Sequence, residues 1–347
     1  MNYRTLGKTK LKVSEIGMGT WQLANDPNMW VGADLKESFR SLYEFVELGG
    51  NFIDTAWVYG FSDDDPNKHP SEELIGKFLK ESKKRIDLII ATKVAPKNWH
   101  WPAWGADKLD DCFPSDHIEK LVNDSLRSLG VDYIDLMQFH VWNDNWSNDD
   151  HWQKTVEKII SSGKVRYWGI SINDYQPSNC FKTLDTGLIS TIQFIFNIFH
   201  QKPEESLLPY AKENNIGLIA RVPLDEGGLT GKFNNETTFE EGDFRNNYFK
   251  GERLLELVKR TDAIKRDTGS EKLAELSLRW ILSHPEVSTT IPGMRKVDYV
   301  KSNTEASEKG KLEDELMKEL KNHAWERNFY APGSVDPEME DQGYIEI

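Results

Sequence analysis

The sequence predicts an α/β fold: one (β/α)8 barrel domain over residues 1–347, with an N-terminal β-hairpin and long loops at one end. Three observations support this prediction. Eight short, mostly apolar runs typical of parallel strands alternate with helical patterns. Consecutive βα units joined by right-handed crossovers close into such a barrel. The sequence G-x-G-x-x-G does not follow the first strand, so the main alternative, a doubly wound sheet, is less favoured.

A short hairpin is expected first, with strands at residues 2–5 and 11–14 around a turn at residues 7–10. The eight strands of the barrel follow as brief apolar runs, as expected for strands covered on both faces. They are predicted at residues 15–20, 51–55, 87–93, 133–139, 165–171, 190–195, 216–221 and 287–291.

Helical patterns occupy the intervals between these strands. The first, residues 36–48, ends at Gly49–Gly50. The second, residues 71–81, has Ser71 as a candidate N-cap. Further helices are predicted at residues 115–129, 151–162, 177–186, 204–214, 251–267, 271–283 and 297–306. A C-terminal helix and tail, residues 307–347, are expected to pack on or near the barrel.

Three segments are longer than ordinary loops: residues 61–70, 95–114 and 222–250. All three follow strands, so they are expected at the carboxyl-terminal end of the barrel, where barrel enzymes bind their substrates. The tail, residues 324–347, either reaches across that face or is mobile.

The composition bounds the class of protein. A formal net charge of −14 argues against a nucleic-acid partner or an anionic membrane partner. The two cysteines, Cys112 and Cys180, allow no disulfide framework, and no histidine or cysteine spacing predicts a metal site. The chain begins without an apolar signal core, and its apolar runs are much shorter than the roughly 20 residues that span a bilayer. We expect a cytoplasmic protein whose oligomeric state the sequence does not predict.

Four polar side chains lie at the ends of predicted strands: Asp54, Tyr59, Lys93 and His140. The phenol of a tyrosine has an ordinary pKa of about 10, and a neighbouring lysine cation favours its deprotonation. An aspartate can position that lysine, and a histidine can donate a hydrogen bond to a polarised oxygen. Such a group suits the reduction of a carbonyl by a hydride supplied from elsewhere.

With these residues in place, the chain resembles the aldo/keto reductase family over residues 3–306. Four segments carry the resemblance in order and at the family's spacing: DTAWVYG with SEELIGKFL, SLRSLGVDYIDLMQFH, PLDEGGLTGKF and TIPGMRKVDYVKSN. The resemblance implies a (β/α)8 barrel that binds a nicotinamide dinucleotide and reduces aldehydes or ketones to alcohols, or runs the reverse oxidation. It also implies that Tyr59 is the general acid, that Lys93 lowers its pKa, that Asp54 pairs with Lys93, and that His140 orients the carbonyl.

The same resemblance implies a set of cofactor-binding residues: Gly19, Thr20, Trp21, Asp54, Ser171, Gln193, Arg221, Leu224, Gly228, Leu229, Gly231, Lys232, Gly293, Arg295 and Asn303. Arg221 stands where the family commonly has an aromatic residue against the nicotinamide. Arginine can stack in the same way, or contact the substrate or the diphosphate. Ile172 replaces a usual asparagine, for which Asn173 is a possible substitute. Asp225 and Glu226 are expected to point away from a phosphate.

The adenosine segment departs from the family pattern. Tyr299 stands where an arginine or glutamine commonly binds the 2′-phosphate, and Ser302 replaces a usual glutamate. Arg295, alone or with Lys296, can supply a charge-assisted contact to that phosphate. We therefore expect NADP as the cofactor, with NADPH preferred over NADH.

Twelve tryptophans are many for a chain of this length. Trp21, Trp57 and Trp142 directly follow strands, and with Tyr59 and His140 they are the predicted substrate-binding residues. An indole presents an apolar face and a polar edge, which suits a flat, hydroxylated ligand. The expected substrate is a polar, hydroxylated carbonyl compound such as an aldose. The alternative is that these tryptophans seal the loops against the barrel.

Two other functions stay open at this point. One is a non-catalytic, cofactor-sensing regulatory subunit with the same fold. The other is a carbohydrate-binding barrel or a glycosidase, and glycoside hydrolysis needs two carboxylates roughly 5 to 10 Å apart. Asp54 could be one of them, but no second carboxylate stands out at a strand end.

Overall fold

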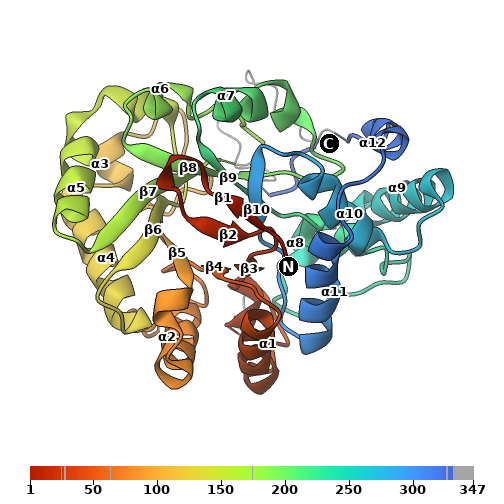
Figure 1. Cartoon of the computed structure of the whole chain (residues 1–347), viewed down its shortest axis with the longest axis horizontal. Helices are drawn as coiled ribbons and strands as arrows, with labels where there is room; N and C mark the ends of the chain where they lie inside the picture. Colours follow the sequence, from red (N-terminus) through yellow and green to blue (C-terminus); the bar gives the residue numbers. More distant parts are fainter. Residues whose placement is uncertain (25, 27–28, 63, 174, 326, 331–347) are drawn as a thin grey trace.

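The structure is a computed structural model that describes residues 1–24, 26, 29–62, 64–173, 175–325 and 327–330. Eight parallel strands pair in the order in which they occur along the chain. They are β3 (Met18–Gly19), β4 (Phe52–Asp54), β5 (Ile89–Val94), β6 (Ile134–Phe139), β7 (Val165–Ser171), β8 (Ile189–Ile195), β9 (Gly217–Arg221) and β10 (Val287–Thr290). Bridges from Ile16 to Thr290 and from Gly19 to Gly293 join the first strand to the last. The predicted (β/α)8 barrel is confirmed (Figure 1).

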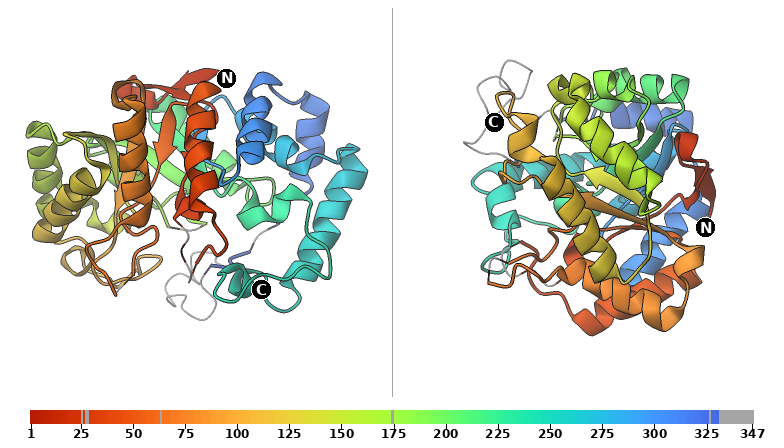
Figure 2. Two further views of the ribbon diagram at one scale, coloured as in Figure 1. Left: turned by 90° about the horizontal axis from the view of Figure 1, so that it is seen from below. Right: turned by 90° about the vertical axis from the view of Figure 1, so that its left-hand side faces the viewer.

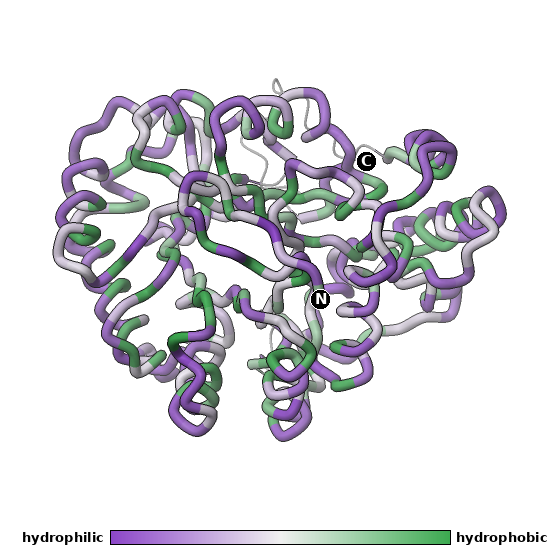
Figure 3. The backbone as a smooth tube through the Cα atoms, in the orientation of Figure 1, coloured by the Kyte–Doolittle hydropathy of each residue, from purple (hydrophilic) through white to green (hydrophobic). Residues whose placement is uncertain are grey.

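Helices surround these strands on the outside (Figures 1 and 2). The longer ones are α1 (Leu35–Glu47), α2 (Pro70–Ser82), α4 (Ser115–Leu129), α5 (Asp150–Ser161), α7 (Leu207–Glu213), α9 (Arg253–Thr268), α10 (Leu273–Leu282), α11 (Val297–Glu308) and α12 (Asp314–Lys321). Figure 3 shows hydrophobic stretches toward the middle of the molecule and hydrophilic ones along its rim. None of the helices within the described residues is long and apolar enough to cross a membrane.

The predicted hairpin is present as β1 (Tyr3–Thr5) and β2 (Lys12–Ser14), which pair antiparallel. Leu6, which lies between the two strands, and Val13, which lies in β2, are fully buried. Both pack in one cluster with the barrel residues Phe52 and Ile219. The hairpin therefore closes the end of the barrel opposite the long loops (Figure 2).

Several helix predictions differ from the structure. The helix predicted at residues 177–186 is only α6 (Phe181–Leu184), and the one at 204–214 is replaced by the 3-10 segment η5 (Lys202–Glu205) followed by α7. Two short helices that were not predicted, α3 (Leu109–Cys112) and α8 (Arg245–Tyr248), lie inside the long loops. One-turn helices carry too few residues for a helical period to show in the sequence.

The prediction that Ser71 is an N-cap is wrong. The cap position is His69, and Pro70 takes the first helical position, which needs no N–H donor. The Ser71 hydroxyl lies inside the fold, 2.9 Å from the hydroxyl oxygens of both Thr20 and Thr55. It therefore links the segments that follow β3 and β4 instead of capping the helix.

The C-terminal helix expected within residues 307–347 is α12, which packs against α9. Its connection continues to Tyr330 across the loop end of the barrel. The rest of the predicted tail, residues 331–347, lies outside the described residues.

Glu72 is a buried acid on α2, next to Thr92 of β5. Its side chain is 0% exposed, and its Oε1 accepts a hydrogen bond of 2.6 Å from the Thr92 hydroxyl. Burial raises the pKa of Glu72 to about 7, and the nearby charge of Asp124 acts in the same direction. The folded protein therefore keeps a proton that the unfolded chain releases at its ordinary pKa near 4.5.

Because the folded state binds the extra proton, Glu72 makes the protein less stable as the pH rises from about 4.5 to about 7, and adds no further change above that range. The loss amounts to roughly 3 kcal/mol in total, at about 1.4 kcal/mol per pH unit. We expect Glu72→Gln to remove this component. Urea unfolding at pH 5 and pH 7.5 measures it, with Glu81→Gln, an exposed glutamate of the same helix, as the control. Equal pH dependence in wild type and Glu72→Gln would contradict the assignment.

Candidate active site

The structure brings together the four polar residues predicted to form the site. Lys93 Nζ lies 2.5 Å from Asp54 Oδ1, 2.8 Å from Thr55 O and 3.2 Å from the Tyr59 hydroxyl. The His140 ring stands edge-on to the Tyr59 ring, with their centroids 5.8 Å apart. The grouping follows from the topology, because β4, β5 and β6 are neighbours and their carboxyl ends meet at one end of the barrel.

Lys93 and Asp54 form a buried ion pair, with side chains 0% and 1% exposed. Burial is the largest single influence and lowers the pKa of Lys93, but the charges and hydrogen bonds of Asp54 and Tyr59 together outweigh it, and the pKa is raised. Lys93 therefore stays charged beside the Tyr59 hydroxyl at neutral pH.

Tyr59 has its pKa raised, not lowered, in this structure. Burial raises it most, and the charge of Lys93 offsets only part of that effect. The expectation that Lys93 lowers the pKa of Tyr59 is right for the contribution of Lys93, and the effect of burial exceeds that contribution. A tyrosine with a raised pKa is fully protonated at neutral pH, so it is available as a proton donor.

His140 is neutral. Burial lowers its pKa well below the ordinary value, and the charges of Lys93 and Arg221 act in the same direction. Its ring lies edge-on to Trp101 as well, at 4.7 Å between centroids. A neutral imidazole in this place can donate one hydrogen bond to a ligand oxygen.

A layer of amides lies beneath the ion pair. Gln138 Nε2 and Gln193 Nε2 lie 3.2 and 2.8 Å from Asp54 Oδ2. Gln193 was predicted as a cofactor residue, and it does line the cavity, but it also supports Asp54. Gln138 was not predicted; its signal is a polar side chain inside the apolar run that forms β6.

A cavity of about 760 Å³ opens above these residues. Most of the predicted cofactor and catalytic residues line it: Gly19, Thr20, Trp21, Asp54, Tyr59, His140, Ser171, Gln193, Arg221, Leu224, Lys232, Gly293, Arg295 and Asn303. Lys93 lies directly below the floor. The volume is within the usual range for small-molecule and cofactor sites.

Two predicted substrate residues do not face the cavity. Trp57 packs against Phe61 and His69, at 4.8 and 4.4 Å between ring centroids. Trp142 is 0% exposed, and its indole N–H donates to the Thr183 hydroxyl at 2.8 Å. Both predictions are wrong, because a position directly after a strand does not fix which way the side chain points.

Other aromatic residues take their place. Besides Trp21, the cavity is lined by Trp30, Phe61, Trp99, Trp101, Phe244 and Tyr330. Trp99 and Trp101 come from the long loop at residues 95–114, whereas Trp104 of the same loop stacks on His100 with ring centroids 3.8 Å apart. The wall around the catalytic group is therefore mostly aromatic.

Three predicted cofactor residues, Gly228, Leu229 and Gly231, do not line the cavity. Leu229 is fully buried, a Cβ added to Gly228 would meet Leu257, and one added to Gly231 would meet Leu273. Within this loop, Glu226, Gly227 and Thr230 face the cavity instead. The segment is the 3-10 turn η6 (Asp225–Thr230), in which Asp225 and Glu226 have the positive φ angles 48° and 51°.

The expectation that the two acids of this turn point away from the cavity is correct for one of them. Asp225 is 0% exposed and accepts a hydrogen bond of 2.8 Å from the Tyr248 hydroxyl. Glu226 lines the cavity, and burial raises the pKa of its carboxyl to about 7. Near neutral pH much of Glu226 is uncharged, which reduces its repulsion of an anion.

Asn173, the possible substitute for the missing asparagine, lines the cavity. Its amide is occupied by the protein, since Oδ1 accepts from Ala103 N and Trp142 N at 3.2 Å and Nδ2 donates to Ala103 O at 3.0 Å. Arg221 donates to Ile172 O at 3.3 Å and extends along the cavity wall.

The far part of the cavity carries positive charge. Arg295 Nη1 donates to Val31 O at 2.8 Å, and Lys232 Nζ lies 4.8 Å from the centroid of the Tyr299 ring. Gln22, in the same wall, has its side-chain oxygen buried without a hydrogen-bond partner among the described residues. A long cavity with cations at one end and the proton-transfer group at the other fits a dinucleotide.

The comparisons with known proteins agree on one family. The model of the aldo/keto reductase family matches residues 15–324. The aldo-keto reductase YhdN of Bacillus subtilis is 33% identical over 310 residues, covering 88% of each chain. A probable voltage-gated potassium channel subunit beta of Arabidopsis thaliana is 28% identical, covering 88% of this chain and 91% of its own. The holo form of aldo-keto reductase AKR11C1 from Bacillus halodurans superimposes with a TM-score of 0.72 at 27% identity, covering 93% of this chain and 96% of its own.

Proposed function

The chain belongs to the aldo/keto reductase family, and from this premise we propose that it reduces aldehydes or ketones to alcohols, or runs the reverse oxidation, with a nicotinamide dinucleotide. One observation carries the proposal. Lys93 Nζ bridges Asp54 Oδ1 at 2.5 Å and the Tyr59 hydroxyl at 3.2 Å, on the floor of a cavity that His140 also faces.

The chemistry divides among these residues. The dinucleotide, when bound, supplies the hydride for reduction. Tyr59 gives its hydroxyl proton to the carbonyl oxygen, and the Lys93 cation stabilises the phenolate that remains. Asp54 keeps Lys93 charged and in place. Neutral His140 donates a hydrogen bond that orients the carbonyl oxygen toward Tyr59.

We propose NADP as the dinucleotide, with NADPH preferred over NADH. Ser171, Gln193 and Arg221 line the part of the cavity next to the catalytic group and suit the nicotinamide end. Arg295 and Lys232 line the far part and suit a phosphate on the adenosine end. Lys296, 5.9 Å from the centroid of the Tyr299 ring, lies on the same side.

The proposed substrate is a carbonyl compound with a flat face and polar groups, such as an aldose. Trp21, Trp99 and Trp101 offer indole faces in the cavity, and His140 and Tyr59 offer the polar groups that hold the carbonyl. Aromatic aldehydes would use the same faces, so both classes belong in the substrate panel.

We expect Tyr59→Phe to keep its dinucleotide affinity but to lose at least about a hundredfold in turnover, because only the proton donor is removed. The measurement is NADPH oxidation with aldoses, hydroxyaldehydes and aromatic aldehydes. Tyr210→Phe is the matched control, since the Tyr210 hydroxyl pairs with the carboxylate of Asp185 outside the cavity. Equal turnover in wild type and Tyr59→Phe would refute the assignment. Dinucleotide binding without turnover in the wild type would favour a cofactor-sensing subunit.

We expect Arg295→Ala to weaken NADPH binding by about tenfold or more and NADH binding by less than about twofold, because a charge-assisted contact to the 2′-phosphate is lost. Titration of protein fluorescence with each dinucleotide measures both affinities. Arg266→Ala serves as the control, because Arg266 is paired with its neighbour Asp267. An equal loss for the two dinucleotides would show that Arg295 does not recognise that phosphate.

A further inference from the structure

A short C-terminal segment reaches back to the turn that borders the cavity. We call Trp325 together with Arg327–Tyr330 the C-terminal anchor, and Leu224–Gly231 the dinucleotide loop. We propose that Arg327 and Tyr330 are positioning residues that hold the dinucleotide loop and thereby set the rate at which a bound dinucleotide leaves. The inference rests on the proposed function, because it assigns a role to residues outside the catalytic group at the same site.

The first contact is an ion pair. Arg327 Nη2 donates to Asp225 Oδ1, and the two side chains are 0% and 1% exposed. The Tyr248 hydroxyl donates to the same oxygen at 2.8 Å. A buried carboxylate next to a diphosphate would repel it, and the Arg327 cation cancels that charge. Removing Arg327 alone would leave Asp225 buried without its counter-ion.

The second contact lies in the cavity wall itself. The Tyr330 hydroxyl donates to Glu226 Oε1, and both side chains line the cavity. The Tyr330 ring also packs with Val222 and Tyr175 over the ends of β8 and β9. The two successive acids of the dinucleotide loop are thus both held by the anchor.

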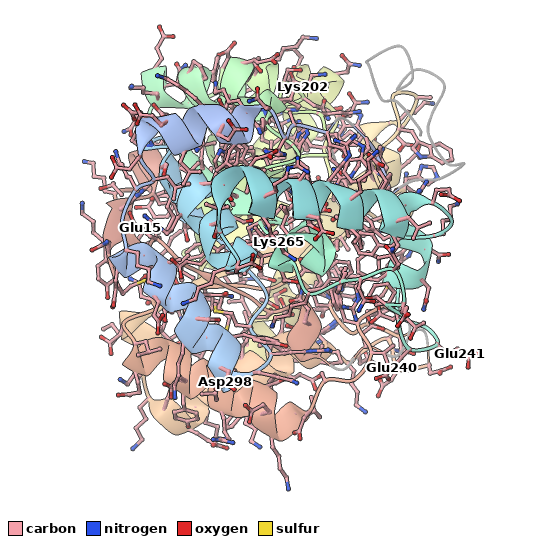
Figure 4. All side chains as sticks on the ribbon, turned by 90° about the vertical axis from the view of Figure 1, so that its right-hand side faces the viewer. Glu15, Lys202, Glu240, Glu241, Lys265 and Asp298 are labelled. Carbon is pink, nitrogen blue, oxygen red and sulfur yellow. The ribbon has the colours of Figure 1, made fainter. Side chains whose placement is uncertain are left out.

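The loop needs such support because of its backbone. Asp225, Glu226 and Gly227 have φ angles of 48°, 51° and 97°, and only glycine adopts this region freely. Side chains with positive φ persist where their surroundings hold them, and here the holding groups come from the anchor. On its other side, the loop is fixed by Lys265 of α9, whose Nζ donates to Gly231 O at 3.2 Å (Figure 4).

The anchor is itself fixed to the barrel. Trp325 N donates to Phe199 O at 2.8 Å. The Arg327 guanidinium lies over the Trp325 ring at 4.2 Å, and the guanidinium of Arg260 on α9 lies 4.5 Å from the same ring. The loop is therefore connected through the anchor to α9 and to the segment that follows β8.

The test measures the release of NADPH by stopped-flow fluorescence in full-length variants. We expect Arg327→Met to release NADPH at least about tenfold faster, and Tyr330→Phe a few times faster. The double variant Asp225→Asn with Arg327→Met should release it more slowly than Arg327→Met alone, because no buried charge is left unpaired. For Arg327→Met, whose side chain does not line the cavity, the rate of hydride transfer in a single turnover at saturating NADPH should stay at the wild-type value, because the catalytic group is intact.

Two substitutions serve as matched controls. Arg166→Met removes an arginine paired with the buried Asp135, which Arg85 also holds, and Tyr210→Phe removes a tyrosine paired with Asp185. Both should leave the release rate unchanged, since neither residue lines the cavity.

The outcomes separate the two proposals. Failure of the wild type to bind NADPH or NADH would overturn the proposed function. Binding by the wild type, with wild-type release rates in Arg327→Met and Tyr330→Phe, would overturn the role of the anchor alone. If Arg327→Met does not fold, Tyr330→Phe and the double variant decide, and unchanged release in both would refute the inference.

Discussion

The ion pair between Lys93 and Asp54 is the constraint on which the rest of the active end depends. Removing two charges from water costs several kcal/mol per ion, and the cost is recovered only with good geometry and full hydrogen bonding. The protein supplies both: a 2.5 Å contact, the carbonyl of Thr55, and amides on Asp54 Oδ2. With Lys93 charged and fixed, the hydroxyl of Tyr59 lies 3.2 Å from a cation at the floor of the cavity.

The amides that contact Asp54 show how the barrel offsets the cost of burying this ion pair. Asp54, Gln138 and Gln193 come from β4, β6 and β8, which are alternate strands of the barrel. Side chains from alternate strands form one layer inside such a barrel. Here that layer is polar and hydrogen-bonded, whereas Phe52, Leu136 and Ile219 belong to an apolar cluster that packs against the hairpin. The polar layer borders the cavity, and the apolar cluster lies toward the hairpin.

The spatial grouping of the four polar residues was predictable because each lies at or just after the carboxyl end of a strand, and parallel strands place these ends together. The eight strands were predictable for a similar reason, since each is a short apolar run. Side-chain direction was not predictable in the same way. Trp57 and Trp142 occupy positions that suggest the cavity, yet their indoles pack inward. Gln138 was overlooked because it is a single polar residue in an apolar run.

The contacts of the C-terminal anchor were the least predictable from the sequence. Arg327 and Asp225 are 102 positions apart, and nothing local in either segment indicates the other. The same limit applies to Tyr330 and Glu226. Such pairs arise from how loops cross the end of a barrel, and a single sequence carries no periodic signal for them. Local sequence patterns therefore predict which residues lie at the strand ends better than they predict the long-range contacts between loops.

The bridge between Ile16 and Thr290 has a consequence for synthesis on the ribosome. The Thr289 hydroxyl donates to Glu15 O across 274 positions of the chain. The sheet can therefore close only when β10, the last strand, is available to pair with the segment of the first strand. Until then the growing chain carries two unpaired strand edges, which favour association with other chains. Closure of the sheet therefore requires that residues 287–290 have been synthesised and can reach the first strand.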